Sequence, residues 1–314
     1  YWEFKKLDNM ESLFENASSF NQNINAWDVD NVTNMKSVFK RAINFNQELD
    51  LWNVSNVKNM QEMFSVAKNF NQELNKWNTI KVNNMSSMFL GAEKFNKHIR
   101  NWNTENVILM NHMFAKAKEF NQDLGEWNVS KVIDMSWMFA NAINFNQSLE
   151  NWYVANVRNM EHMFNGANKF NQPLNKWIVI SVTNMRSMFE SATNFNQIIQ
   201  DWRVLSVTDM SIMFAKAKNF NQPLNLWNVS NVTDMRGMFS NAINFNQDIN
   251  DWNVSKVKNM EGMFLNAKKF NSNLNKWDVS NVENMSSMFF GAISFDKMLN
   301  NWDISNVTSM KFMF

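Results

Sequence analysis

The chain of 314 residues carries 30 lysine and arginine residues against 29 aspartate and glutamate residues, so its formal net charge is +1. Positively and negatively charged residues are scattered along the sequence, which argues against electrostatic binding to nucleic acid or to an anionic membrane. Cysteine is absent, which excludes disulfide bonds and thiolate metal sites, and no apolar run approaches the roughly 18 residues of a membrane-spanning helix.

A repeat of 25 residues runs through the sequence without an insertion or a deletion. Trp recurs from Trp2 to Trp302, Met from Met10 to Met310, and Phe from Phe14 to Phe314. Stacked turns of chain keep such a phase because each inward residue must lie on its counterpart in the neighbouring turn. The sequence therefore predicts a single α/β solenoid domain over residues 1–314, with about 12.5 rungs of 25 residues. Because it starts without Met and stops within a repeat, we expect it to be a piece of a longer chain.

Two elements are predicted in each rung. Around Trp27–Val29, apolar and polar residues alternate, which indicates a short parallel β-strand. From Met35 onward the apolar residues follow helical spacing, and Asn34 stands where a helix cap is expected, so a short helix is predicted around Met35–Lys40. Gly or Asn often precedes the repeated Ala and marks the end of this helix: Asn16, Gly91, Asn141, Gly166, Asn241, Asn266 and Gly291.

A Phe-Asn-Gln corner closes the rung, and its Asn recurs from Asn21 to Asn271 before Asp296 replaces it. We expect an inward ladder in which each amide bonds backbone groups that the corner leaves unpaired. A row of Asn that binds glycans or metal ions is the alternative.

The segment Leu49–Val54 has the pattern L-x-x-W-x-V, which is similar to the strand motif of leucine-rich repeats, although Val57 stands where that motif has Asn. The longer string FNQPLNLWNVSNVTDMRGMF of residues 220–239 resembles the repeat of the BspA-like leucine-rich-repeat surface proteins, also described as a mycoplasma lipoprotein-associated repeat. The resemblance covers the whole chain. It implies a leucine-rich-repeat-like fold and an extracellular, cell-surface-attached protein that acts in adhesion or host interaction. It supplies no catalytic residue.

Residues that could carry chemistry are few. The three histidines, His98, His112 and His162, lie in different rungs, and no spacing for a catalytic triad, a phosphate loop or a zinc site occurs. We therefore expect no catalytic residue, no metal site, no cofactor, no small-molecule substrate and no enzymatic activity.

A break in the repeat predicts a partner-binding surface. The two outward residues that flank the strand Val are usually Asn or Asp and Ser, but three successive rungs carry Tyr153 with Ala155, Ile178 with Ile180, and Arg203 with Leu205. Aromatic, aliphatic and Arg side chains are the anchors that protein interfaces use. We predict that Tyr153, Ile178, Ile180, Arg203 and Leu205 bind a protein or another cell-surface macromolecule; neutral drift or a contact between chains is the alternative.

Two functions follow from these patterns. The first is a surface-displayed rod that binds a macromolecular partner through its outer face. The second is a structural protein whose rods self-associate into a filament or surface layer, through apolar residues such as Trp2, Phe4, Met313 and Phe314.

Overall fold

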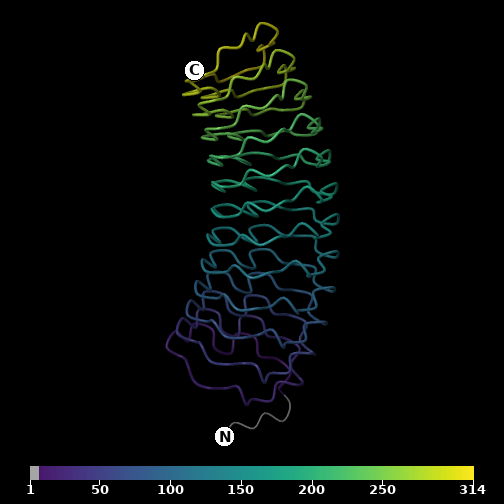
Figure 1. The fold of residues 1–314 in the computed structure, drawn as a ribbon, viewed down its shortest axis with the longest axis vertical. Coiled ribbons are helices and arrows are strands. Elements are labelled where there is room, and N and C mark those ends of the chain that lie inside the picture. Colours follow the sequence, from purple (N-terminus) through teal and green to yellow (C-terminus); the bar gives the residue numbers. More distant parts are fainter. Residues whose placement is uncertain (1–6) are drawn as a thin grey trace. The chain divides into compact units, whose positions relative to one another are not determined.

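The computed structural model describes residues 7–314, which form two compact units divided between Val154 and Ala155. Unit 1 ends at Val154, and unit 2 is Ala155–Phe314. Within each unit the backbone passes through successive 25-residue turns that stack as rungs (Figure 1). The single solenoid domain over residues 1–314 stays a prediction, and the proposed roles of Trp2 and Phe4 lie outside the described residues.

The helix predicted around Met35–Lys40 is not found, because residues 7–314 contain no helix, and hence none long and apolar enough to cross a membrane. The segment is instead a run of consecutive turns with two left-handed residues in the rung, Ser37 (φ 56°) and Arg41 (φ 58°). A left-handed residue cannot continue a right-handed α-helix. The Gly and Asn residues predicted to end the helix do adopt this conformation, for example Gly91 and Asn141.

The same segment carries the hydrogen bonds that join one rung to the next. Every second amide donates to a carbonyl of the following rung: Met35 to Asn59 (2.9 Å), Ser37 to Gln61 (2.8 Å), Phe39 to Met63 (2.8 Å) and Arg41 to Ser65 (2.7 Å). The carbonyl of Lys36, in the same peptide group as the Ser37 amide, accepts from Ser12 of the preceding rung. These peptide groups thus align along the stack, with their amides toward the next rung and their carbonyls toward the preceding one.

The strand predicted around Trp27–Val29 is also corrected. Residues 7–314 form no strand longer than an isolated bridge, and the extended residues after Trp27 take part in none. The amide of Asp30 bonds the Asp28 carboxylate at 3.0 Å, so the local side chain removes the donor that a ladder needs. The bridges are parallel, as predicted, but lie later in the rung: in unit 1 they join Asn9, Asn34, Asn59, Asn84, Leu109 and Asp134 in succession, and in unit 2 Asn159, Asn184, Asp209, Asp234, Asn259, Asn284 and Ser309.

The core of each unit consists of stacked aromatic and aliphatic columns. In one rung Phe39 stacks on Phe45 with ring centroids 3.9 Å apart, and on Phe64 of the next rung at 5.4 Å. Trp52 is buried, and its indole Nε1 donates to the carbonyl of Ile24 in the preceding rung at 3.1 Å. The Trp therefore fills the core, and its buried indole N–H finds an acceptor in a carbonyl that also accepts the backbone amide of Trp27 at 3.0 Å.

The predicted ladder of corner asparagines forms, but at the edge of the rung rather than inside it. In unit 2 the side-chain oxygen of Asn196 accepts the amide of Asn221 at 2.9 Å and the Nε2 of Gln222 at 3.1 Å. Asn196 itself is half-buried. Each corner Asn thus accepts a hydrogen bond from one backbone amide of the next rung. This structural role accounts for the row of asparagines without a bound glycan or metal ion.

Replacing Asn196 tests this role. Asn196→Ala leaves the half-buried amide of Asn221 without its acceptor, and we expect the free energy of unfolding to fall by about 1–3 kcal/mol. Urea unfolding followed by Trp fluorescence measures the change. Asn196→Asp keeps an acceptor oxygen and is the matched control; an equal loss in both variants contradicts the role assigned to that oxygen.

Val66 tests the left-handed positions in unit 1. It adopts φ 58° although it is β-branched, whereas Asn141 holds the equivalent position at φ 57°. Because Asn tolerates this conformation better, Val66→Asn is expected to raise the free energy of unfolding by about 1 kcal/mol. Lys116→Asn, at the same repeat position but from an unbranched residue, serves as the comparison in thermal unfolding. A gain at Lys116 as large as at Val66 argues against relief of β-branched strain.

Candidate partner-binding surface

In most rungs the turn that follows the Trp has a polar outer surface, and its exposed backbone amide is hydrogen-bonded to a side chain of the same turn. In the rung of Trp227, the side-chain oxygen of Asn228 accepts the amide of Ser230 at 3.1 Å, at an exposed position. The same cap joins Asp28 to Asp30, Asn53 to Ser55, Asn78 to Ile80, Asn103 to Glu105, Asn128 to Ser130, Asn253 to Ser255, Asp278 to Ser280 and Asp303 to Ser305. These rungs offer a partner mainly small polar side chains.

Four of the predicted site residues lie together in unit 2. Ile178, Ile180 and Leu205 are 48%, 45% and 47% exposed, and Arg203 is exposed as well. Ile180, Arg203 and Leu205 line one hollow of about 580 Å³, while Ile178, Ile180 and Arg203 line a second of about 330 Å³. The shared residues make the two hollows one surface.

One residue of this surface was missed by the sequence analysis. Leu226, 61% exposed, lines the larger hollow together with Leu205. The signal was available, because the position before the Trp is otherwise mostly polar, as at Lys176 and Asp251, and Leu226 interrupts that pattern. We call Ile178, Ile180, Arg203, Leu205 and Leu226 the outer patch.

The remaining residues of the predicted surface have different positions. Tyr153 is 55% exposed but belongs to unit 1, so its place beside the outer patch stays a prediction. Ala155, which the sequence pattern placed outward beside it, is buried, with 9% of its surface exposed.

The outer patch also lacks the usual cap. Neither Ile178 nor Arg203 has a side-chain acceptor, and the amides of Ile180 and Leu205 make no hydrogen bond to any residue in the range 7–314. The Arg203 guanidinium likewise has no hydrogen bond or ion pair within the described part of the chain. The surface therefore combines aliphatic side chains with unused hydrogen-bond donors.

Comparison with protein families gives one match that spans the chain. The family described as "Mycoplasma protein of unknown function, DUF285" matches residues 1–98, 69–177, 162–271 and 220–314. The chain belongs to this family. Comparison with curated proteins gives no match.

Solved structures similar to this DUF285 member share little sequence with it. The TLR13–ssRNA13 complex is 14% identical over 92% of this chain and 44% of that chain, with a TM-score of 0.28. The internalin InlF from Listeria monocytogenes is 11% identical over 86% and 80%, with a TM-score of 0.30. The leucine-rich-repeat protein LIC12759 from Leptospira interrogans is 8% identical over 88% and 75%, with a TM-score of 0.31. At these scores the likeness supports no argument about function.

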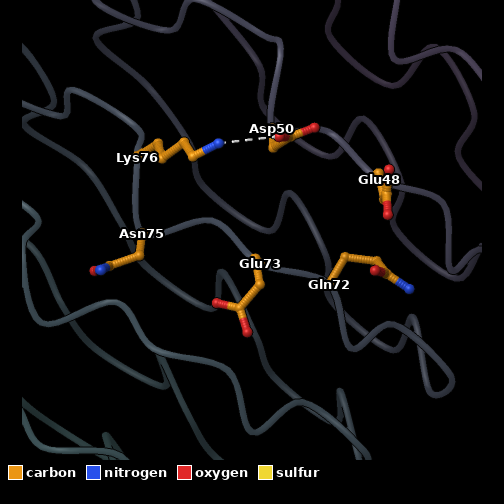
Figure 2. Close-up of a pocket in the computed structure, with 6 residues that line it drawn as sticks. All are labelled: Glu48, Asp50, Gln72, Glu73, Asn75 and Lys76. Atoms are coloured by element: carbon orange, nitrogen blue, oxygen red, sulfur yellow. Dashed lines mark hydrogen bonds and ion pairs between the residues drawn. The ribbon is translucent and has the colours of Figure 1, made fainter.

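A third hollow, of about 360 Å³, lies on unit 1 of this DUF285 member and is polar (Figure 2). Asp50 accepts from Asn25 at 2.9 Å and pairs with Lys76 at 3.3 Å; these hydrogen bonds, that from Asn25 first, lower the pKa of Asp50. Glu73 pairs with Lys97 at 3.4 Å. The residues described contain no group of His, Asp and Glu that could hold a metal ion. With two of its three carboxylates, Asp50 and Glu73, already paired, this hollow offers a partner less than the outer patch does.

Asp234 in unit 2 shows how the polar positions of the rung are constrained. Its carboxylate accepts the amide of Arg236 at 2.8 Å, in the cap that Asn forms in other rungs. Partial burial raises the pKa of Asp234, and the neighbouring Asp209 carboxylate adds to the rise, while the amide bond opposes it. The ionised form is therefore disfavoured in the folded protein.

Asp234→Asn is expected to raise the free energy of unfolding modestly at pH 7, because it keeps the cap and removes the unfavourable charge. A raised folded-state pKa means that the wild type loses stability as pH rises from the unfolded pKa, near 3.8, through the folded pKa. The advantage of the variant should thus shrink on acidification to below that unfolded value. Urea unfolding across pH measures it. Asp278→Asn, an exposed cap of the same geometry, is the control and should give no comparable gain.

Proposed function

We propose that this chain is a non-enzymatic repeat protein, displayed on a cell surface, that binds a protein partner through the outer patch. The kinship with BspA-like adhesion proteins, the extracellular location and the absence of a cofactor belong to the same proposal. The observation that carries it is the gathering of exposed aliphatic side chains and Arg203 at positions where the other rungs carry mainly small polar side chains.

The energetics favour a protein partner. Ile178, Ile180, Leu205 and Leu226 are each between 45% and 61% exposed, so binding removes a substantial apolar area from water. Apolar patches of this kind on a polar surface are typical of protein interaction sites. Arg203 supplies a planar group with several donors, one of the residue types enriched among interface hot spots.

The regular rungs explain why such a patch can exist without disturbing the fold. Within the described residues, the side chains of the outer patch form no hydrogen bond between rungs; only the backbone carbonyls of Ile180 and Leu205 accept one, from the side chains of Ser206 and Asn231. The outer surface can therefore change while the core columns stay in phase. No residue of the outer patch pairs a nucleophile with a base, which supports binding rather than catalysis.

The test is the double variant Ile180→Asp with Leu205→Asp. Two carboxylates on the patch oppose burial of the hollow, so we expect at least about a tenfold loss of affinity. The measurement is a saturation isotherm of the labelled protein on cultured epithelial cells, repeated after trypsin treatment of the cells. Binding that survives trypsin contradicts a protein partner.

Ser255→Asp with Ser280→Asp is the matched control, because it places the same charges at the same repeat position of two other rungs in unit 2. Thermal unfolding confirms that both double variants fold. Unchanged cell binding by the folded Ile180→Asp, Leu205→Asp protein overturns the proposal. Light scattering separates the self-assembly alternative, in which the wild type forms oligomers that this double variant does not form.

A further inference from the structure

The uncapped amides of the outer patch indicate what it recognises. Ile80 occupies the same repeat position as Ile180, yet its amide still bonds the side chain of Asn78 at 3.2 Å. The aliphatic residue is therefore not what frees the amide. The free donors at Ile180 and Leu205 result from Ile178 and Arg203 standing where other rungs have Asn or Asp.

The free donors belong to one small region. In capped rungs the acceptor of this amide is an exposed side chain, so the amide faces the outer surface. Ile180 and Leu205 occupy adjacent rungs of unit 2, and both line the larger hollow with Arg203. Two backbone N–H groups and an unpaired guanidinium thus adjoin the same apolar hollow.

Charge complementarity points to an acidic ligand. Arg203 lines the smaller hollow, and Asp201 is the one carboxylate among the described residues that line it. Asp201 forms no ion pair with Arg203 within the described chain, so the guanidinium remains available. Backbone N–H groups and Arg together form the usual setting for a carboxylate, whose two oxygens accept separate hydrogen bonds.

We propose that the outer patch binds an acidic-aliphatic segment of the partner protein. A Glu or Asp carboxylate of that segment accepts hydrogen bonds from the amides of Ile180 and Leu205 and from the Arg203 guanidinium. A neighbouring aliphatic side chain enters the hollow formed by Leu205 and Leu226. This inference rests on the proposed function and names the chemistry of its partner.

Two matched peptides test the ligand chemistry directly. The acidic probe is acetyl-Leu-Glu-Leu-Asp-Leu-amide, and its neutral counterpart replaces Glu and Asp by Gln and Asn. In titrations followed by amide NMR, the acidic peptide should move the amide resonances of Ile180 and Leu205 downfield and bind about tenfold more tightly than the neutral one. Equal binding, or no shift of these two resonances at millimolar peptide, overturns the proposal.

Variants of this region separate charge from backbone. Arg203→Met removes the guanidinium and leaves the Leu205 amide open, and we expect about a tenfold loss of affinity for the acidic peptide. Arg203→Asn removes the same charge and also restores the cap, so its loss should be several-fold greater. Ile178→Asn restores the cap on Ile180 without changing any charge and should weaken binding several-fold, whereas Ile178→Leu should not. If the recapped variants bind like their uncapped counterparts, the amides play no part and the inference fails.

The outcomes distinguish this inference from the proposed function. If the neutral peptide binds as well as the acidic one, but Ile180→Asp with Leu205→Asp still abolishes cell binding, the patch binds proteins without a carboxylate and only the inference fails. If a heparin oligosaccharide shifts the same amides more strongly than the acidic peptide, the occupant is a sulfated glycan and the inference is overturned. If cell binding is indifferent to that double variant, the proposed function itself fails.

Discussion

In each rung, every second amide along one segment donates a hydrogen bond to a carbonyl of the next rung. The backbone conformation, the repeat length and the core of the chain all have to be compatible with these hydrogen bonds. The amides of Met35, Ser37 and Phe39 all donate to the next rung, and the middle one belongs to Ser37, which is left-handed. That geometry leaves no place for an α-helix. It also fixes the repeat at 25 residues, since one inserted residue shifts every donor away from its acceptor and every core side chain away from its column.

Backbone satisfaction explains several residue choices that hydrophobicity leaves open. The indole N–H of Trp52 donates to the carbonyl of Ile24 in the preceding rung, and the side-chain oxygen of Asn196 accepts the backbone amide of Asn221 in the next rung. The side chain of Asn228 caps the amide of Ser230. Each of these side-chain atoms forms a hydrogen bond with a backbone group that takes no part in the bonds between rungs described above. Polar residues recur at the same repeat positions along the chain because the hydrogen bonds, as well as the core contacts, recur from rung to rung.

The sequence was sufficient for the repeat, the inward columns and the clustering of Ile178, Ile180, Arg203 and Leu205, because periodicity directly reports which residues share a position. It was insufficient for the local backbone. Met35 and Phe39 lie at helical spacing, yet the intervening Ser37 is left-handed and carries no compositional sign of it. Asp28 and Asp30 alternate with apolar residues like an outward strand face, but they form a local cap. Both errors arise because side-chain spacing does not report where the backbone donors point, and that depends on the neighbouring rung.

The properties of the outer patch also depend on which backbone donors have a hydrogen-bond acceptor. An exposed amide that loses its cap is still solvated, because water replaces the side-chain acceptor at little cost in folding free energy. The fold therefore tolerates Ile178 and Arg203 at cap positions, and the stacking of Trp177 on Trp202 continues beneath them at 6.2 Å. A ligand carboxylate at Ile180 and Leu205 has to displace only that water, while the aliphatic side chains around it lose water on binding. Backbone donors that water solvates in the free protein therefore cost little folding free energy. Because they lie within apolar surface, their hydrogen bonds to a ligand are accompanied by burial of that surface, which favours binding.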